Sequence, residues 1–190
     1  MSDKPSYLGL LNAIALGESR AHCYLTAWMA VTPSPDVKRV LATVAAREGE
    51  HGMSFAKRID ELGYTVLDRP DARFDEHLAI AGSDRSDLEK MELLGLHELD
   101  RGDGPDIFDG FFGNHDIDIR TGELLGRYIA EERDSARLLR SCYEQLRAAA
   151  SPATGSSQQL SGLEVKVDAL CRAVEELRQI VCAQTMAPSG

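Results

Sequence analysis

The stretch VAAREGEHGMSF at residues 44–55 decides the predicted fold, because it combines a helical apolar pattern with two residue types that bind metals. Val44, Glu48, His51 and Phe55 follow one another at steps of four, three and four residues, so they share one face of a helix. Val44 and Phe55 indicate that this face is buried. Because burial of an unpartnered Glu or His is costly, the pattern predicts partners in the core for both side chains.

Helical periodicity continues on both sides of this stretch. Alanine, leucine, glutamate and arginine dominate the composition, and the few Val and Ile residues fall at helical spacing, which favours an all-helical chain. The expected helices are residues 7–31, residues 36–62 with Asp36 as the cap and Gly63 as the stop, a segment from Ser86 or Asp87 through Glu98, and residues 118–149.

Residues 64–84 lose this periodicity, and Arg69-Pro70 and Gly82-Ser83 within them are typical of loops. We expect the segment to be a long crossover that separates the first pair of helices from the second. The predicted fold class is therefore all-α, with a four-helix bundle and one long crossover over residues 1–149.

A linker and a separate helix are predicted after the bundle. Residues 150–159 are small and polar, as in flexible linkers. Residues 160–184 carry Leu and Val at alternating four- and three-residue steps, which is the heptad pattern of a coiled coil, and residues 185–190 form a tail. Val at one seam position with Leu at the other favours a parallel pair of chains, so we expect a homodimer or a dimer-based assembly. The alternative is that this helix packs back onto its own bundle.

Composition and charge argue against several classes of partner. The net charge is −10 and no basic stripe occurs, which disfavours binding to nucleic acid or to an anionic membrane surface. No run of about 18 apolar residues is present, and residues 1–5 lack the features of a signal peptide, so a cytoplasmic location is expected. The four cysteines form no Cys-x-x-Cys pair, which excludes the usual zinc-ribbon or rubredoxin site and favours buried free thiols.

A weak internal repeat extends the set of candidate ligands beyond Glu48 and His51. When the second predicted helix is laid over the fourth so that Glu48 falls on Glu132, the apolar residues align and His51 falls on Ser135. Bundles that bind metals need several inward carboxylates, because hard cations prefer oxygen ligands. Glutamates at comparable places in the first and third helices complete the candidate metal ligands, which are Glu18, Glu48, His51, Glu98 and Glu132.

With this arrangement the chain resembles the ferritin-like superfamily of ferritins, bacterioferritins and rubrerythrins, over about residues 5–149. The resemblance implies that each half of the bundle supplies a glutamate from one helix and Glu-x-x-His from the next, and that these residues bind a pair of iron ions. The first half matches this pattern with Glu18, Glu48 and His51. The second half departs from it at Ser135, and many ferritins also lack a histidine there.

The activity implied by the resemblance is that of a di-iron oxidoreductase that uses dioxygen or peroxide. Ferrous iron as the substrate would make the protein a ferroxidase, and an organic substrate would make it an oxygenase. A rubrerythrin-like peroxidase is disfavoured because the chain has no cysteine-rich electron-transfer domain. The alternative is a metal-free helical scaffold in which arginines such as Arg20, Arg47 and Arg133 neutralise the glutamates.

Two of the residues near these ligands have more than one reading. Glu18 is able to pair with His22 one turn later on the same helix, and this pair could coexist with metal binding. Tyr128 lies one turn before Glu132 and either approaches the metals or simply fills the core. His77, His97 and His115 are read as loop or surface residues.

Overall fold

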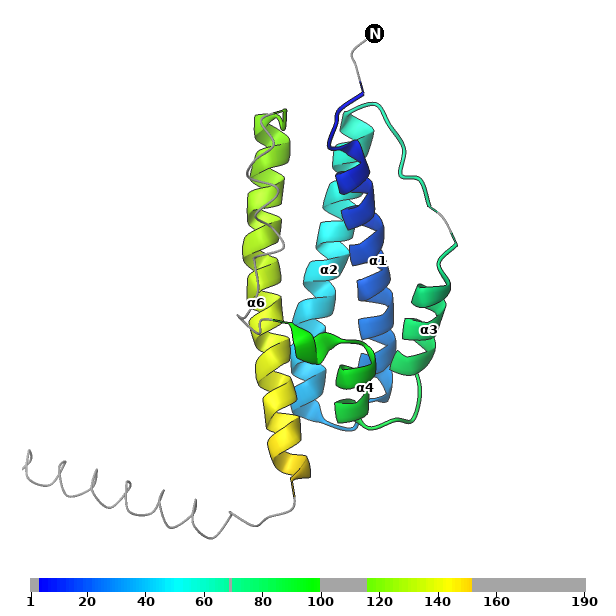
Figure 1. Ribbon diagram of the computed structural model, residues 1–190, viewed down its shortest axis with the longest axis vertical. Helices are drawn as coiled ribbons and strands as arrows, with labels where there is room; N and C mark the ends of the chain where they lie inside the picture. The colour runs from blue at the N-terminus through cyan, green and yellow to red at the C-terminus, as the bar shows by residue number, and fades with distance from the viewer. Residues whose placement is uncertain (1–3, 69, 100–115, 152–190) are drawn as a thin grey trace, which may run out of the picture. The chain divides into compact units, whose positions relative to one another are not determined.

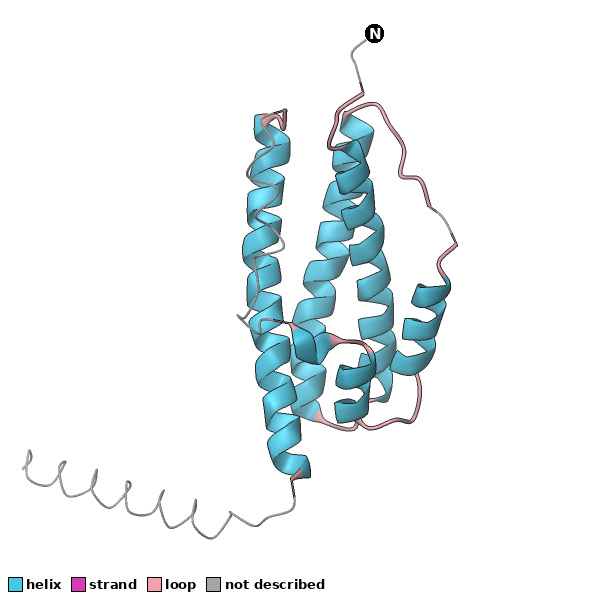
Figure 2. Ribbon diagram, in the orientation of Figure 1, coloured by secondary structure: helices cyan, strands magenta, loops and turns pink. Residues whose placement is uncertain are grey.

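The computed structural model describes residues 4–68, 70–99 and 116–151, and over these ranges it confirms the prediction of an all-α chain (Figures 1 and 2). The described residues form helices and no strand. The elements are α1 (Leu8–Val31), α2 (Pro35–Glu61), α3 (Ala72–Ala81), α4 (Asp87–Leu93), a 3₁₀ turn (Leu96–Glu98) and α6 (Ile119–Ala150).

Helices α1 and α2 form a hairpin closed by a short loop. Ser34 caps α2, because its side chain accepts a hydrogen bond of 3.3 Å from the backbone N–H of Val37, and Pro35 occupies the first turn, where its missing N–H is harmless. The prediction of Asp36 as the cap is therefore wrong by two positions. Gly63 ends the helix as predicted, with a φ of 82° that glycine adopts without strain.

The crossover contains a helix that the sequence pattern did not predict. Helix α3 lies beside α1 and begins at Asp71, whose side chain accepts a hydrogen bond from the backbone N–H of Arg73. The helix is ten residues long and buries only Ala81 fully, so its apolar periodicity is too weak to recognise. His77 belongs to this helix, where its ring meets the ring of Tyr24 edge-on at 5.6 Å, so its assignment to a loop was wrong.

The third predicted helix is much shorter than expected. It begins at Ser86, as one of the two predicted starts, with a capping box in which Ser86 and Glu89 bind each other's backbone N–H groups. It ends at Leu93, because Gly95 takes a φ of 72° and breaks the helical hydrogen bonding. The prediction that one continuous helix reaches Glu98 is therefore wrong.

Helix α6 matches the fourth predicted helix to within about one residue at each end. It contributes to two apolar clusters that lie toward opposite ends of α1 and α2. The cluster near the Trp28 end consists of Leu25, Trp28, Val37, Leu41, Val44, Ala45, Ala81, Met91, Leu94, Leu96, Leu139, Cys142 and Tyr143. The cluster at the other end consists of Tyr7, Leu8, Leu11, Ile14, Ala15, Phe55, Ile59, Leu125, Tyr128 and Ile129.

The chain divides into two units, Met1–Ala148 and Ala149–Gly190. All but a few residues of the second unit lie outside the described ranges, and so do the predicted linker after residue 151, the predicted coiled coil at residues 160–184 and the tail at 185–190. Cys171, Cys182 and His115 also lie outside them. Of the other two cysteines, Cys142 is buried as expected, but Cys23 is exposed, so the prediction of burial is wrong for that residue.

Candidate metal centre

A group of four possible metal ligands lies between the two apolar clusters. Glu18 of α1, Glu48 and His51 of α2 and Glu132 of α6 each direct one ligand atom into a region where all four atoms lie within 4.8 Å of one another. The structure thus brings together four of the five candidate residues. Glu18, Glu48 and His51 are buried, with 8%, 6% and 2% of their surfaces exposed, whereas Glu132 is partly exposed.

The close approach of α1 to α2 depends on glycine beside the ligands. A Cβ atom at Gly52 would lie 2.5 Å from Oγ and 3.0 Å from the backbone nitrogen of Ser19, which is one residue after Glu18. The first distance is too short for a real Cβ atom, and the second would require the Ser19 backbone to shift, because a rotamer change cannot relieve a backbone contact. Gly52 therefore lets the two helices approach closely enough for Glu18 to reach the ligands on α2.

Three buried atoms of the group have no hydrogen-bond partner. They are Oε2 of Glu18, Nδ1 of His51 and Oε1 of Glu132, one from each of the three long helices. His51 Nδ1 lies 3.9 Å from the Glu18 atom and 3.3 Å from the Glu132 atom, so the three converge on one place. Buried polar atoms are rarely left unpaired, and a bound cation would satisfy all three at once. These residues therefore fit a metal ion.

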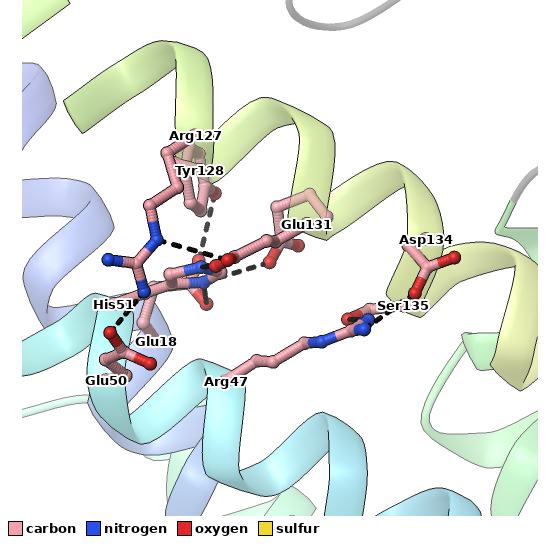
Figure 3. Close-up of polar contacts among 10 residues, drawn as sticks. Glu18, Arg47, Glu50, His51, Arg127, Tyr128, Glu131, Asp134 and Ser135 are labelled. Carbon is pink, nitrogen blue, oxygen red and sulfur yellow. Dashed lines mark hydrogen bonds and ion pairs between the residues drawn. The ribbon is translucent and has the colours of Figure 1, made fainter. Parts of the chain in front are cut away.

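The second nitrogen of His51 is bound to a carboxylate that the sequence analysis did not single out. Nε2 of His51 lies 2.6 Å from Oε2 of Glu131. Figure 3 draws both side chains and marks their contact. Arg127 donates to the other oxygen of Glu131 at 3.1 Å and also pairs with Glu50 on α2. When Nε2 carries the proton, Nδ1 is able to offer its lone pair to a metal, and metal-binding histidines commonly donate their other ring N–H to a carboxylate in this way.

Tyr128 contacts the group directly and also packs against core side chains. Its hydroxyl donates a hydrogen bond of 2.9 Å to Oε1 of Glu18, and the contact is buried. Its ring meets His51 and Phe55 edge-on, with centroids 5.1 and 5.3 Å away. Tyr128 therefore both fills the core and orients the Glu18 carboxylate, leaving Oε2 free to act as a ligand.

Without a bound cation, the pKa values of Glu18, Glu48 and His51 all depart from their ordinary values. Burial raises the pKa of Glu48, and the carboxylate of Glu18 raises it further, so Glu48 retains its proton at neutral pH. Burial alone would lower the pKa of His51, but the surrounding carboxylates outweigh it and raise that pKa to about 10. Contacts with His51 and Glu48 also outweigh burial at Glu18 and lower its pKa. A bound metal ion would take the place of the protons on Glu48 and on Nδ1 of His51.

Glu98 lies away from this group. It belongs to the 3₁₀ turn, its side chain is 54% exposed, and its Oε1 lies 2.8 Å from Nε2 of the neighbouring His97. The left-handed conformation of Gly95 separates this turn from α4, so Glu98 does not continue the buried face that contains Met91. The structure therefore does not include Glu98 in the group of four ligands.

The position of the missing second histidine is filled by a different interaction. Ser135 is 2% exposed, and its hydroxyl accepts a hydrogen bond of 3.3 Å from Nη1 of Arg47. Nη2 of Arg47 pairs with Asp134 at 2.7 Å (Figure 3). Arg20, a second arginine expected to neutralise the glutamates, pairs with Asp68 and Asp71.

Comparison of the chain with family models, with curated proteins and with solved structures finds no match. Among the helices of the described ranges, none is both long enough and apolar enough to cross a membrane. The residues of the group are thus the main observation from which a function is inferred.

Proposed function

We propose that this protein binds iron through Glu18, Glu48, His51 and Glu132 and uses it in an oxidation that consumes dioxygen or peroxide. The observation that carries the proposal is the convergence of three buried ligand atoms from three helices, none of which has a hydrogen-bond partner. A metal-free scaffold would gain no hydrogen bonds from these three atoms, and buried polar atoms without hydrogen bonds lower the stability of the fold.

The donor types favour iron or manganese over zinc and calcium. Three carboxylates and one imidazole form an oxygen-rich set with one nitrogen, which suits iron or manganese. Structural zinc sites use cysteine and histidine, and calcium takes oxygen ligands alone. Bound iron would supply electrons to dioxygen or peroxide.

The surrounding residues prepare the ligands for this role. Glu131 holds the Nε2 proton of His51, so that Nδ1 faces the site and would offer its lone pair once a metal displaces its proton. Tyr128 fixes one oxygen of Glu18 and leaves the other free. The apolar clusters on either side, with Phe55 and Leu41 fully buried, limit the access of water to the ligands.

The fold and the substrate belong to the same proposal. We take the three long helices to be part of a ferritin-like bundle, because each of them presents a ligand to a common centre, and residues 160–184 to be its dimerising coil. Ferrous iron itself is the simplest substrate, which would make the activity that of a ferroxidase. Oxygenation of an organic molecule is the other outcome, and turnover with iron as the only reductant distinguishes the two.

Anaerobic titration with ferrous iron tests the proposal. Wild-type protein should bind iron and develop a near-ultraviolet band when air is admitted, and the Glu48→Ala/His51→Ala double variant should do neither. Glu123→Ala, which removes an exposed carboxylate from α6, is the matched control and should behave as wild type. The proposal is overturned if wild-type protein binds no iron or if the double variant binds it equally well.

A further inference from the structure

The described ligands are sufficient for one metal ion but not for two. Glu18, Glu48, His51 and Glu132 all lie within 4.8 Å of one another, which matches the first coordination shell of a single ion. A second ion would need further ligands, and within residues 4–68, 70–99 and 116–151 the helical pattern of the sequence offers Glu98 and the residue at position 135 for that role. Glu98 is exposed and pairs with His97, and Ser135 offers only a hydroxyl, a poor ligand for ferrous iron.

A positively charged side chain contacts Ser135, the residue that falls on His51 in the internal repeat. Arg47 immediately precedes Glu48 on α2, and its guanidinium crosses to α6, where it donates to Ser135 and pairs with Asp134 (Figure 3). Two contacts to α6 hold it there, and its side chain is only 27% exposed. Asp134 also pairs with Arg137, at 3.1 Å. Its single negative charge is therefore shared between two arginines and does not fully neutralise Arg47.

Charge balance agrees with this geometry. The three ligand carboxylates carry three negative charges when a metal displaces their protons, and one dipositive ion together with one guanidinium balances them. A second dipositive ion beside the guanidinium would leave excess positive charge in a partly buried space, where repulsion is stronger than in water.

We propose that the centre binds a single divalent metal ion per chain and that the guanidinium of Arg47, held by Ser135 and Asp134, takes the place of a second ion. The inference rests on the proposed function, since it concerns the same ligands. It makes Arg47 the residue that sets the metal stoichiometry.

Stoichiometry measured with metal alone tests this inference. Full-length protein is titrated anaerobically with ferrous iron, and in parallel with Co²⁺, whose visible absorption reports ligand number without turnover. Wild-type protein should saturate at about one ion per chain. The Arg47→Leu/Ser135→His variant removes the guanidinium, supplies an imidazole beside Glu132, and should saturate at about two.

Two controls separate the role of Arg47 from general damage. Arg47→Lys keeps the positive charge and should still bind about one ion. Arg39→Leu, which removes an exposed arginine two turns earlier on α2, should also bind about one. Circular dichroism establishes that each variant is folded.

The possible results separate the inference from the proposed function. Saturation of wild-type protein at two ions overturns the inference and leaves the proposed function standing, and this result does not depend on any variant. A folded Arg47→Leu/Ser135→His variant that still binds one ion overturns the role of Arg47. Absence of binding to wild-type protein overturns both proposals.

Discussion

Nε2 of His51 lies 2.6 Å from Oε2 of Glu131, and this contact joins α2 to α6 beside the candidate metal centre. Glu131 is in turn held by Arg127, so the imidazole is oriented by a chain of polar contacts that reaches the surface at Glu50. The neighbouring Glu132 is itself a candidate ligand, whereas Glu131 orients His51, a candidate ligand on another helix.

We expect Glu131→Gln to weaken metal binding without abolishing it. The amide no longer accepts the Nε2 proton as strongly, so the Nδ1 lone pair of His51 is less available, and such changes typically lower metal affinity about 10–100-fold. Competition titration of Co²⁺ against a chelator measures the difference. Glu123→Gln on the same helix is the control and should leave affinity unchanged. Equal affinities for Glu131→Gln and wild type would show that the contact does not support the site.

Glu48→Gln should separate metal binding from stability. Burial and the neighbouring carboxylates raise the pKa of Glu48, so the metal-free protein contains the neutral carboxyl group, which an amide imitates in size and in its ability to donate to Glu18. The free energy of unfolding without metal should therefore change by less than about 1 kcal/mol, while metal binding is lost. Urea unfolding in the presence of chelator measures the first quantity and titration the second. A large loss of metal-free stability would contradict the neutral state of Glu48.

Asp118 should make the fold sensitive to acid. Burial opposes its ionisation, but hydrogen bonds from Tyr7, Thr121 and Arg58 outweigh this effect and hold the pKa of Asp118 well below its usual range. A carboxyl group with a lowered folded-state pKa stabilises the protein fully above its unfolded-state pKa of about 3.9, and this contribution is lost as the pH falls toward the folded-state pKa.

Asp118→Asn should thus lower the free energy of unfolding by about 1 kcal/mol at pH 7, since the carboxylate is partly exposed, and by less at pH 3. Urea unfolding at the two pH values gives the comparison. Asp75→Asn, at an exposed position on α3, is the control. A destabilisation as large at pH 3 as at pH 7 would assign the effect to packing instead of charge.

The two glycines of α2 near the ligands should respond differently to alanine. At Gly52 a Cβ atom would meet the Ser19 backbone at 3.0 Å, so Gly52→Ala should force α1 and α2 apart, destabilise the protein by about 1–3 kcal/mol and weaken metal binding. At Gly49 the three nearest atoms to the Cβ all belong to the His22 ring, so Gly49→Ala should displace this ring and its contact with the Ala45 carbonyl but not a helix backbone, and should cost less.

Gly17→Ala on α1 meets nothing within 4 Å and should stabilise the helix by about 0.5–1 kcal/mol. Thermal unfolding monitored by circular dichroism gives the order of the three variants. If Gly52→Ala is as stable as Gly17→Ala, the close approach of the two helices is not needed for the fold.

Removal of residues 155–190 should reduce the oligomeric mass. The heptad pattern at 160–184 extends over about three heptads, and a helix of that length needs a packing partner to be stable in water. Light scattering on the truncated and full-length proteins measures the mass. An unchanged mass would rule out the coil as the element of assembly, without bearing on the metal centre.

The long helices show how much of the fold can be predicted from the spacing of apolar residues along one helix. Helices α1, α2 and α6 were predicted to within a few residues, because each buries a continuous apolar face whose spacing is visible in the sequence. The same spacing placed Glu18, Glu48, His51 and Glu132 on buried faces. Where the apolar face is short, as in α3, the pattern was too weak to reveal the helix.

The sequence by itself therefore determined the all-helical class of the described residues and four of the residues that meet in the core, since both follow from helical periodicity. Tertiary structure alone decided that Glu98 stays outside, that Glu131 binds His51 and that Arg47 reaches Ser135. The physical reason is that these outcomes depend on the φ angle of one glycine and on contacts between residues about 80 or more positions apart, neither of which periodicity within one helix reports.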